Sequence, residues 1–216
     1  MRQRRLALSV LVAAALGCGG TSSAGGTTSS WQSGGPGYVA GPPSTVAESL
    51  FPLVDGHLYH YRMEVLGDRV EPAGMLMMRV SRRDATHGEL RKPAGTQAFE
   101  YVADGVATTT KTGAPAYLFK VPASRELSWL GPHGGSTRYT ELAIPVTAPS
   151  GTYSGCNRTR EEVRGDLPKA IVTTICPGVG IVQLRVEGGG GAEQAELVYY
   201  GAPIDIGPDG VTKSKD

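Results

Sequence analysis

The sequence predicts an all-β fold: a single antiparallel β domain of about nine to ten strands, built as a barrel, a half-barrel or a sandwich. Its dominant hydrophobic period is two, as in residues 57–65, where Tyr59, Tyr61, Met63 and Val65 alternate with polar residues. The 31 glycines and 15 prolines punctuate short segments of this kind. No helical stripe exceeds a few residues, apart from one turn at 45–50. Short strands separated by such turns are typical of barrels and sandwiches.

Ten segments carry the strand pattern and are taken in chain order. They are 59–65, 75–81, 97–103, 106–110, 117–121, 137–146, 153–164, 169–175, 180–186 and 194–200. Asp104-Gly105 suits a tight hairpin turn, and the glycine run 188–191 separates the last two segments. The strand-bearing domain is therefore expected at 47–204, with a flexible Gly- and Pro-rich tail at 205–216.

The N-terminus has the layout of a secretory signal. Three arginines at positions 2, 4 and 5 precede an apolar stretch at 6–16, which is too short to span a bilayer as a helix. The sequence Ala15-Leu16-Gly17-Cys18 resembles the bacterial lipobox, in which the cysteine is acylated, with palmitate among the usual chains, and becomes the mature N-terminus. We therefore expect a lipoprotein signal peptide at 1–17 and lipidation of Cys18. The alternative is an ordinary signal peptide, cut nearby, with Cys18 unused.

Residues 18–46 are expected to hold the anchor cysteine and a disordered Gly/Ser/Thr linker, because their composition cannot bury enough apolar surface to order the chain. This organisation predicts a protein of the bacterial cell envelope, tethered by its lipid to the outer membrane and facing the periplasm. The three arginines lost with the signal leave 18 Lys and Arg against 20 Asp and Glu, a formal balance of about −2. Such a balance lacks the basic footprint of nucleic-acid binding, so no nucleic-acid partner is expected.

Lipidation of Cys18 would leave Cys156 and Cys176 as an even pair in an oxidising compartment. Their positions are symmetric about Asp166, in a Gly-Asp-Leu-Pro turn. A hairpin around this turn places the two cysteines directly opposite each other, close enough for a disulfide at a non-hydrogen-bonded pair. A metal pair or a redox-active pair is the alternative, but the C-x-x-C spacing typical of either is missing.

Three elements of the chain resemble a group of bacterial envelope lipoproteins with a TapB-like domain. The first is Phe51-Pro52-Leu53 followed by a glycine and an aromatic-rich strand. The second is the segment 148–157, which includes Pro149, Gly151-Thr152-Tyr153 and Cys156-Asn157, and the third is 177–182, with the sequence PGVGIV. The resemblance implies an antiparallel β domain of unknown function, with no catalytic residues to carry over.

No constellation in the sequence predicts catalysis, a metal site or a cofactor. Residues His57 and His60 point to opposite faces of a strand, while His87 and His133 lie in loops. The His-Gly-Gly at 133–135 resembles an esterase oxyanion loop, but no G-x-S-x-G elbow accompanies it. Adjacent Glu161 and Glu162 face apart, as in a solvated hairpin, and the arginines at 79, 82 and 83 are typical of a solvated strand end.

The aromatic residues lie almost wholly in the expected strands. They form either the core or the lining of an apolar cleft, whose candidates are Tyr59, Tyr61, Met63, Phe99, Tyr101 and Trp129. The sequence therefore predicts a non-enzymatic, membrane-anchored lipoprotein that acts as an interaction or structural module, with other envelope proteins as partners. The alternative is a carrier or sensor of an apolar ligand, such as a lipid, in a β cup. A hydrolase is the third possibility, and no motif supports it.

Overall fold

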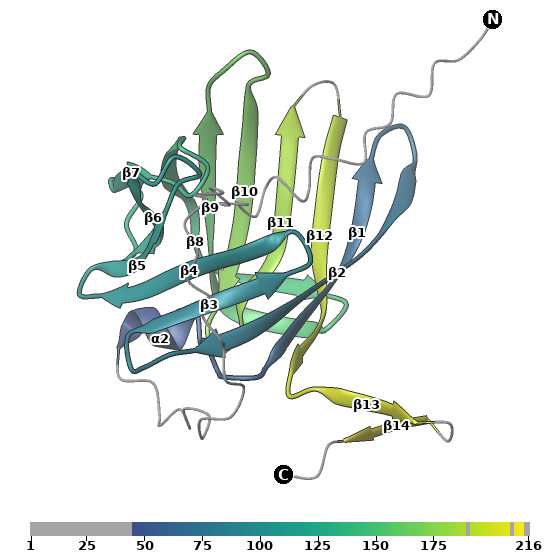
Figure 1. Cartoon of the computed structure of the whole chain (residues 1–216). Coiled ribbons are helices and arrows are strands. Elements are labelled where there is room, and N and C mark those ends of the chain that lie inside the picture. The colour runs from purple at the N-terminus through teal and green to yellow at the C-terminus, as the bar shows by residue number, and fades with distance from the viewer. Residues whose placement is uncertain (1–44, 189–190, 208–209, 214–216) are drawn as a thin grey trace, which may run out of the picture.

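The computed structural model describes residues 45–188, 191–207 and 210–213, and it is built of antiparallel β-strands (Figure 1). One short helix, α2 (Val46–Leu50), precedes the strands. The expected signal peptide, Cys18 and nearly all of the linker lie outside the described residues.

The strands follow one another along the chain with short connections. Their bounds are β1 (Leu58–Leu66), β2 (Val70–Arg82), β3 (His87–Lys92), β4 (Gly95–Val102), β5 (Gly105–Thr109), β6 (Pro115–Lys120), β7 (Ser128–Leu130), β8 (Ser136–Ala148), β9 (Gly151–Val163), β10 (Lys169–Cys176), β11 (Gly180–Gly188), β12 (Gly191–Gly201), β13 (Ile204–Gly207) and β14 (Gly210–Lys213).

Strands β1 to β12 form one sheet that curls into a nearly closed barrel. The order across the sheet is β6-β5-β4-β3-β2-β1-β12-β11-β10-β9-β8-β7, so β6 and β7 are its two edges. In Figure 1, β3 and β4 cross in front of the upright strands β9 to β12. Trp129 on β7 donates an indole hydrogen bond of 3.1 Å to the carbonyl of Tyr117 on β6. A side chain of the β7 edge therefore reaches the backbone of the β6 edge.

The all-β antiparallel class is confirmed, but the expected strand number was too low, because the sheet has twelve strands rather than nine to ten. The sequence pattern missed β3, whose sequence HGELRK places Gly88, Glu89 and Leu90 in succession in buried surroundings and so shows no clean alternation. It also missed β7, because three residues are too few to display a period. Within the segment expected to be a flexible tail, β13 and β14 pair as a separate two-stranded sheet.

The segment 45–53 closes one end of the barrel. Thr45 caps α2 by accepting a hydrogen bond of 3.0 Å from the backbone N–H of Glu48, which explains why the predicted helical turn forms here. The chain then turns inward, and the side chains of Phe51 and Leu53 are completely buried in the core. Phe51 packs edge-on against Phe99 of β4, with ring centroids 5.3 Å apart. We call residues 45–53 the plug.

The β9–β10 hairpin has the register that symmetry about Asp166 predicts. Its pairs run from Val163 opposite Lys169 to Asn157 opposite Ile175, which places Cys156 opposite Cys176 in the next position. The two cysteines are joined as a disulfide, with Cα atoms 4.1 Å apart, and both are fully buried. This close spacing is that of a non-hydrogen-bonded antiparallel pair.

Candidate functional site

A buried ion-pair-like contact joins Glu161 of β9 to His133 in the loop between β7 and β8. One carboxylate oxygen of Glu161 lies 2.8 Å from His133 Nδ1. The other accepts hydrogen bonds from the backbone N–H groups of His133 and Gly135, at 2.9 and 2.8 Å. The His133 side chain is 10 % exposed and that of Glu161 is 5 % exposed. We call this arrangement the Glu161–His133 clamp.

Glycines in the loop make room for the clamp. A Cβ atom at Gly131 would lie 2.3 Å from the carboxyl carbon of Glu161, and one at Gly135 would lie 2.8 Å from its Cγ. Any larger residue at these positions would collide with the buried carboxylate. Gly134 has a φ of 83°, in the left-handed region that glycine adopts without strain. The sequence 131–135 therefore folds as a glycine cradle around one acidic side chain.

The clamp borders a cavity of about 30 Å³ inside the barrel. Its lining combines apolar side chains from β3, β4, β6 and β11 with polar groups that include Gln97, Thr137 and Thr159. His133 Nε2 and Thr137 Oγ1 are buried and have no hydrogen-bond partner among the described residues. A space of this size holds about two water molecules, which would satisfy both atoms.

The clamp contains the two elements of an oriented base, because a carboxylate fixes one imidazole nitrogen and leaves the other facing a cavity. The cavity, however, is at least about tenfold smaller than the roughly 300–1,000 Å³ of ordinary ligand pockets. The arrangement can order water and hold the loop against β9. The cavity has no room for a substrate larger than one or two water molecules.

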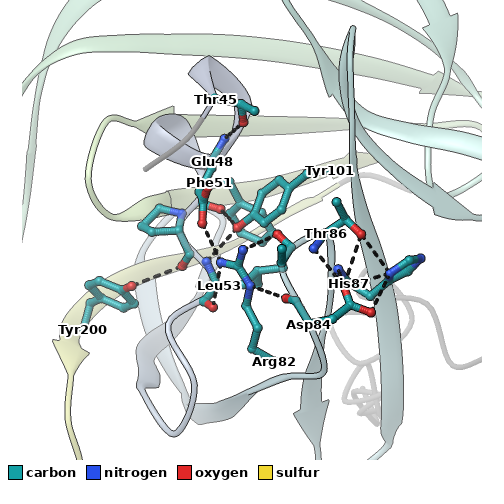
Figure 2. Close-up of polar contacts among 12 residues, drawn as sticks. Thr45, Glu48, Phe51, Leu53, Arg82, Asp84, Thr86, His87, Tyr101 and Tyr200 are labelled. Carbon is teal, nitrogen blue, oxygen red and sulfur yellow. Dashed lines mark hydrogen bonds and ion pairs between the residues drawn. The ribbon is translucent and has the colours of Figure 1, made fainter. Parts of the chain in front are cut away.

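A second buried polar cluster ties the plug to the sheet (Figure 2). Arg82 of β2 forms an ion pair of 2.7 Å with Glu48 of α2, and the side chains are 1 % and 8 % exposed. Its Nε donates to the carbonyl of Asp84 at 2.9 Å. The guanidinium also lies over the ring of Tyr101, 4.9 Å from its centroid. The expectation of a solvated strand end was therefore wrong for Arg82, because α2 covers it.

Tyrosine hydroxyls complete this attachment. The hydroxyl of Tyr101 donates to the carbonyl of Phe51 at 2.7 Å and accepts from the N–H of Leu53 at 2.8 Å. The hydroxyl of Tyr200, on β12, donates to the carbonyl of Pro52 at 3.1 Å. Burial raises the pKa of Tyr200 to about 12, so this donor keeps its proton at neutral pH. Strands β4 and β12 thus both hold the backbone of residues 51–53.

The structure disperses the six candidate cleft residues through the core. Five of them, Tyr59, Tyr61, Phe99, Tyr101 and Trp129, are buried, and Met63 is half-buried at the packing boundary. Phe99 lines the cavity of about 30 Å³ beside the clamp, and Tyr61 lines another of about 10 Å³. Neither space accommodates a lipid chain. In these surroundings the aromatic rings pack against one another, as Tyr59 and Tyr200 do at 4.6 Å between centroids.

The histidines occupy separate parts of the fold. Burial lowers the pKa of His57, whose ring packs edge-on against that of Tyr200 with centroids 5.2 Å apart. The exposed ring of His87 lies 3.0 Å from the carboxylate of Asp84, which also accepts bonds from the backbone N–H groups of Thr86 and His87. This contact closes the β2–β3 turn. Over the described ranges, no group of three or more His, Cys, Asp or Glu is arranged to hold a metal ion.

Sequence reasoning placed His133 in a loop correctly but missed its partner. Glu161 was expected in a solvated hairpin, yet its side chain points inward while neighbouring Glu162 is exposed. The alternation of β9 does indicate that Glu161 is buried, because it lies two residues after buried Thr159 and therefore on the same face of the strand. What the sequence does not show is that a loop 28 residues upstream returns to meet it.

The described residues define a single-domain all-β protein whose buried polar groups hold its loop and plug in place. No helix in the described part of the chain has both the length and the apolar character needed to cross a membrane. No protein-family model matches the chain, and a search of curated proteins found no significant match. Assignment to the TapB-like lipoproteins therefore stays a prediction.

Two solved structures resemble the chain at low identity. One, from Bacteroides fragilis, is described as an exported protein with a YmcC-like fold; it is 9 % identical, with a TM-score of 0.46, over 70 % of this chain and 98 % of that chain. The other, from Parabacteroides distasonis, is described as a lipoprotein; it is 10 % identical, with a TM-score of 0.43, over the same shares. At these scores we transfer neither fold nor function from either protein.

Proposed function

We propose that this chain is a non-enzymatic lipoprotein of the bacterial envelope, anchored by Cys18 to the outer membrane, and that its β domain serves as a rigid interaction or structural module of the TapB-like kind. The anchoring rests on the signal-like residues 1–17 and the lipobox-like end of that segment. A linker of roughly 28 residues would let the domain reach on the order of 30 Å from the membrane surface.

The observation that carries the module function is the filled interior of the barrel. The aromatic side chains that could have lined a ligand cup instead pack together and bond to backbone carbonyls, as Tyr61 does to Ile181 at 2.8 Å. The spaces beside Phe99 and Tyr61 hold about 30 and 10 Å³. A rigid, filled barrel presents its outer surface rather than its interior, which favours a module over a lipid carrier.

The anchoring is tested by growing cells that express the whole chain with an alkyne analogue of palmitate. We expect label on the wild type and none on Cys18→Ala, and we expect only the wild type to sediment with outer membranes. An unlabelled wild-type chain, or a Cys18→Ala chain that still sediments, would refute the anchor.

Native mass spectrometry separates the module from the carrier. The module predicts one species, the acylated chain without further lipid. A second lipid without a phosphate headgroup, such as a free fatty acid, that co-purifies with the wild type and also with Cys18→Ala would instead support the apolar-ligand carrier.

A further inference from the structure

A depression of about 510 Å³ lies on the outer face of β8 and β9, where β8 begins and β9 ends. It is lined by Gly134, Gly135, Ser136, Arg138, Glu162 and Arg164. On these strands Thr137 and Glu161 are buried, so the alternating residues Arg138 and Glu162 face outward. Unlike the cavity at the clamp, this space falls within the volume range of small-molecule sites.

The charges around the depression are unbalanced. Arg158 and Arg160, on the same outer face, are paired with Glu141 and with Glu162 and Glu187. Within the described residues, neither Arg138 nor Arg164 forms an ion pair, although both are exposed and line the depression. The depression therefore holds two guanidinium groups that no carboxylate of the described residues pairs with.

The position of Arg138 is unfavourable for folding alone. It lies directly opposite Arg160 in the β8–β9 ladder, and both side chains face outward. Like charges directly opposite each other in an antiparallel pair destabilise the sheet. Glu162 and Glu187 balance the charge of Arg160, whereas the charge of Arg138 has no such carboxylate among the described residues, as expected of a group that holds an anion.

The remaining lining groups define the rest of the ligand. Ser136 lies opposite Glu162 in the ladder, so the lining of the depression includes a hydroxyl and a carboxylate on neighbouring strands. Glu162 contacts Arg160 Nε through one oxygen, at 2.6 Å, and its second oxygen can accept a hydrogen bond from a ligand hydroxyl. Two arginines match the charge of about −1.5 to −2 on a phosphate monoester and can grip its oxygens with their forked donors.

We propose that this depression is a binding site for a polyol phosphate, in which Arg138 and Arg164 hold the phosphate and Glu162 and Ser136 bind hydroxyl groups. A phosphate with hydroxyl groups beside it occurs in a soluble sugar or glycerol phosphate, as a monoester, and in the headgroup of phosphatidylglycerol, as a diester with a single negative charge. The site is independent of the lipid anchor, so loss of the anchor at Cys18 leaves it intact.

The test uses the full chain, purified in a neutral detergent, in two arms. In the first arm, sn-glycerol 3-phosphate is titrated by isothermal calorimetry. In the second, micelles of the same detergent that carry either phosphatidylglycerol or phosphatidylcholine are titrated in the same way. Arg138→Gln and Arg164→Gln are each compared with Arg185→Gln, which removes an outward-facing arginine that is paired with Glu187 and does not line the depression.

We expect Arg138→Gln and Arg164→Gln each to weaken binding by about tenfold, since each removes a charge-assisted hydrogen bond, and Arg185→Gln to leave it within about twofold. Binding of glycerol 3-phosphate with this pattern assigns a soluble source, and the same pattern in the phosphatidylglycerol arm alone assigns the lipid headgroup. Absence of binding in both arms, or weakening that is equal in Arg185→Gln, overturns the site.

Thermal unfolding keeps the test independent of folding defects. Because Arg138 opposes Arg160, Arg138→Gln should leave the melting temperature unchanged or raise it, while it weakens binding. Arg138→Lys keeps the charge but loses the forked donor, so its affinity should fall between those of wild type and Arg138→Gln. Parallel losses of melting temperature and binding across these variants would also overturn the proposal.

Discussion

Replacement of Glu161 by alanine should destabilise the domain more than any other single change to an acidic residue in β9. The carboxylate accepts hydrogen bonds from two backbone N–H groups and contacts His133 Nδ1, all in surroundings where the side chain is 5 % exposed. Alanine leaves these three groups without their partner. Each buried unsatisfied group costs about 1–3 kcal/mol, so the three groups together cost about 3–9 kcal/mol, and we expect the lower part of this range because water can enter.

Glu162 supplies a matched control, because it is the next residue on the same strand but faces the solvent. It is paired with Arg160 on the exposed surface, and such pairs contribute about 0–1 kcal/mol. Urea unfolding of Glu161→Ala and Glu162→Ala, followed by tryptophan fluorescence, gives both free energies of unfolding. The reasoning is refuted if the two variants lose similar stability, or if Glu161→Ala loses less than about 1 kcal/mol.

Three further predictions concern the plug, the disulfide and the buried carboxylate of β12. Glu48→Ala leaves the guanidinium of Arg82 buried without its carboxylate and should cost about 3–5 kcal/mol in urea unfolding, whereas a loss under about 1 kcal/mol would show that α2 does not hold it. Reduction of Cys156–Cys176 should cost about 3 kcal/mol on the chain-entropy model, seen as a lower melting temperature with dithiothreitol, and Cys156→Ser/Cys176→Ser should melt at the same temperature with or without the reductant. Burial raises the pKa of Glu193, so the folded state binds its proton more tightly than the unfolded state does; stability from this group is present at low pH and is lost as pH rises through the folded pKa. Glu193→Gln should therefore raise the melting temperature relative to wild type at pH 7 but not at pH 4. An equal shift in melting temperature at the two pH values would contradict a raised pKa of Glu193.

The fold class and the β9–β10 hairpin could be predicted because local signals agree there. The alternation of residues 153–163 and the Gly-Asp-Leu-Pro turn both point to one register, and the structure has it. Strand β3 could not be predicted, because Glu89 is buried in the middle of it. That carboxylate contacts Arg83 and Arg91, which lie on either side of it in sequence, and a hydrophobicity pattern does not register an ion pair.

The buried polar groups were harder still to predict. The contact between Glu161 and His133 depends on how the loop between β7 and β8 folds past β8 to reach β9. The contact between Arg82 and Glu48 depends on α2 packing beneath β2 and β4. In both cases the sequence displays a charged residue of ordinary appearance. Its burial is decided by a partner 28 or 34 residues away.

The pairing of β1 with β12 also sets an order on how this chain acquires its structure. Leu58 lies opposite Gly201, so the first strand of the barrel has to wait for the last one before its second edge is covered. The plug is likewise held by Tyr200, through the carbonyl of Pro52. Contacts so distant in sequence form slowly, because a long loop must close before they contribute. A chain built in this way keeps one edge of β1 uncovered until β12 is available to pair with it.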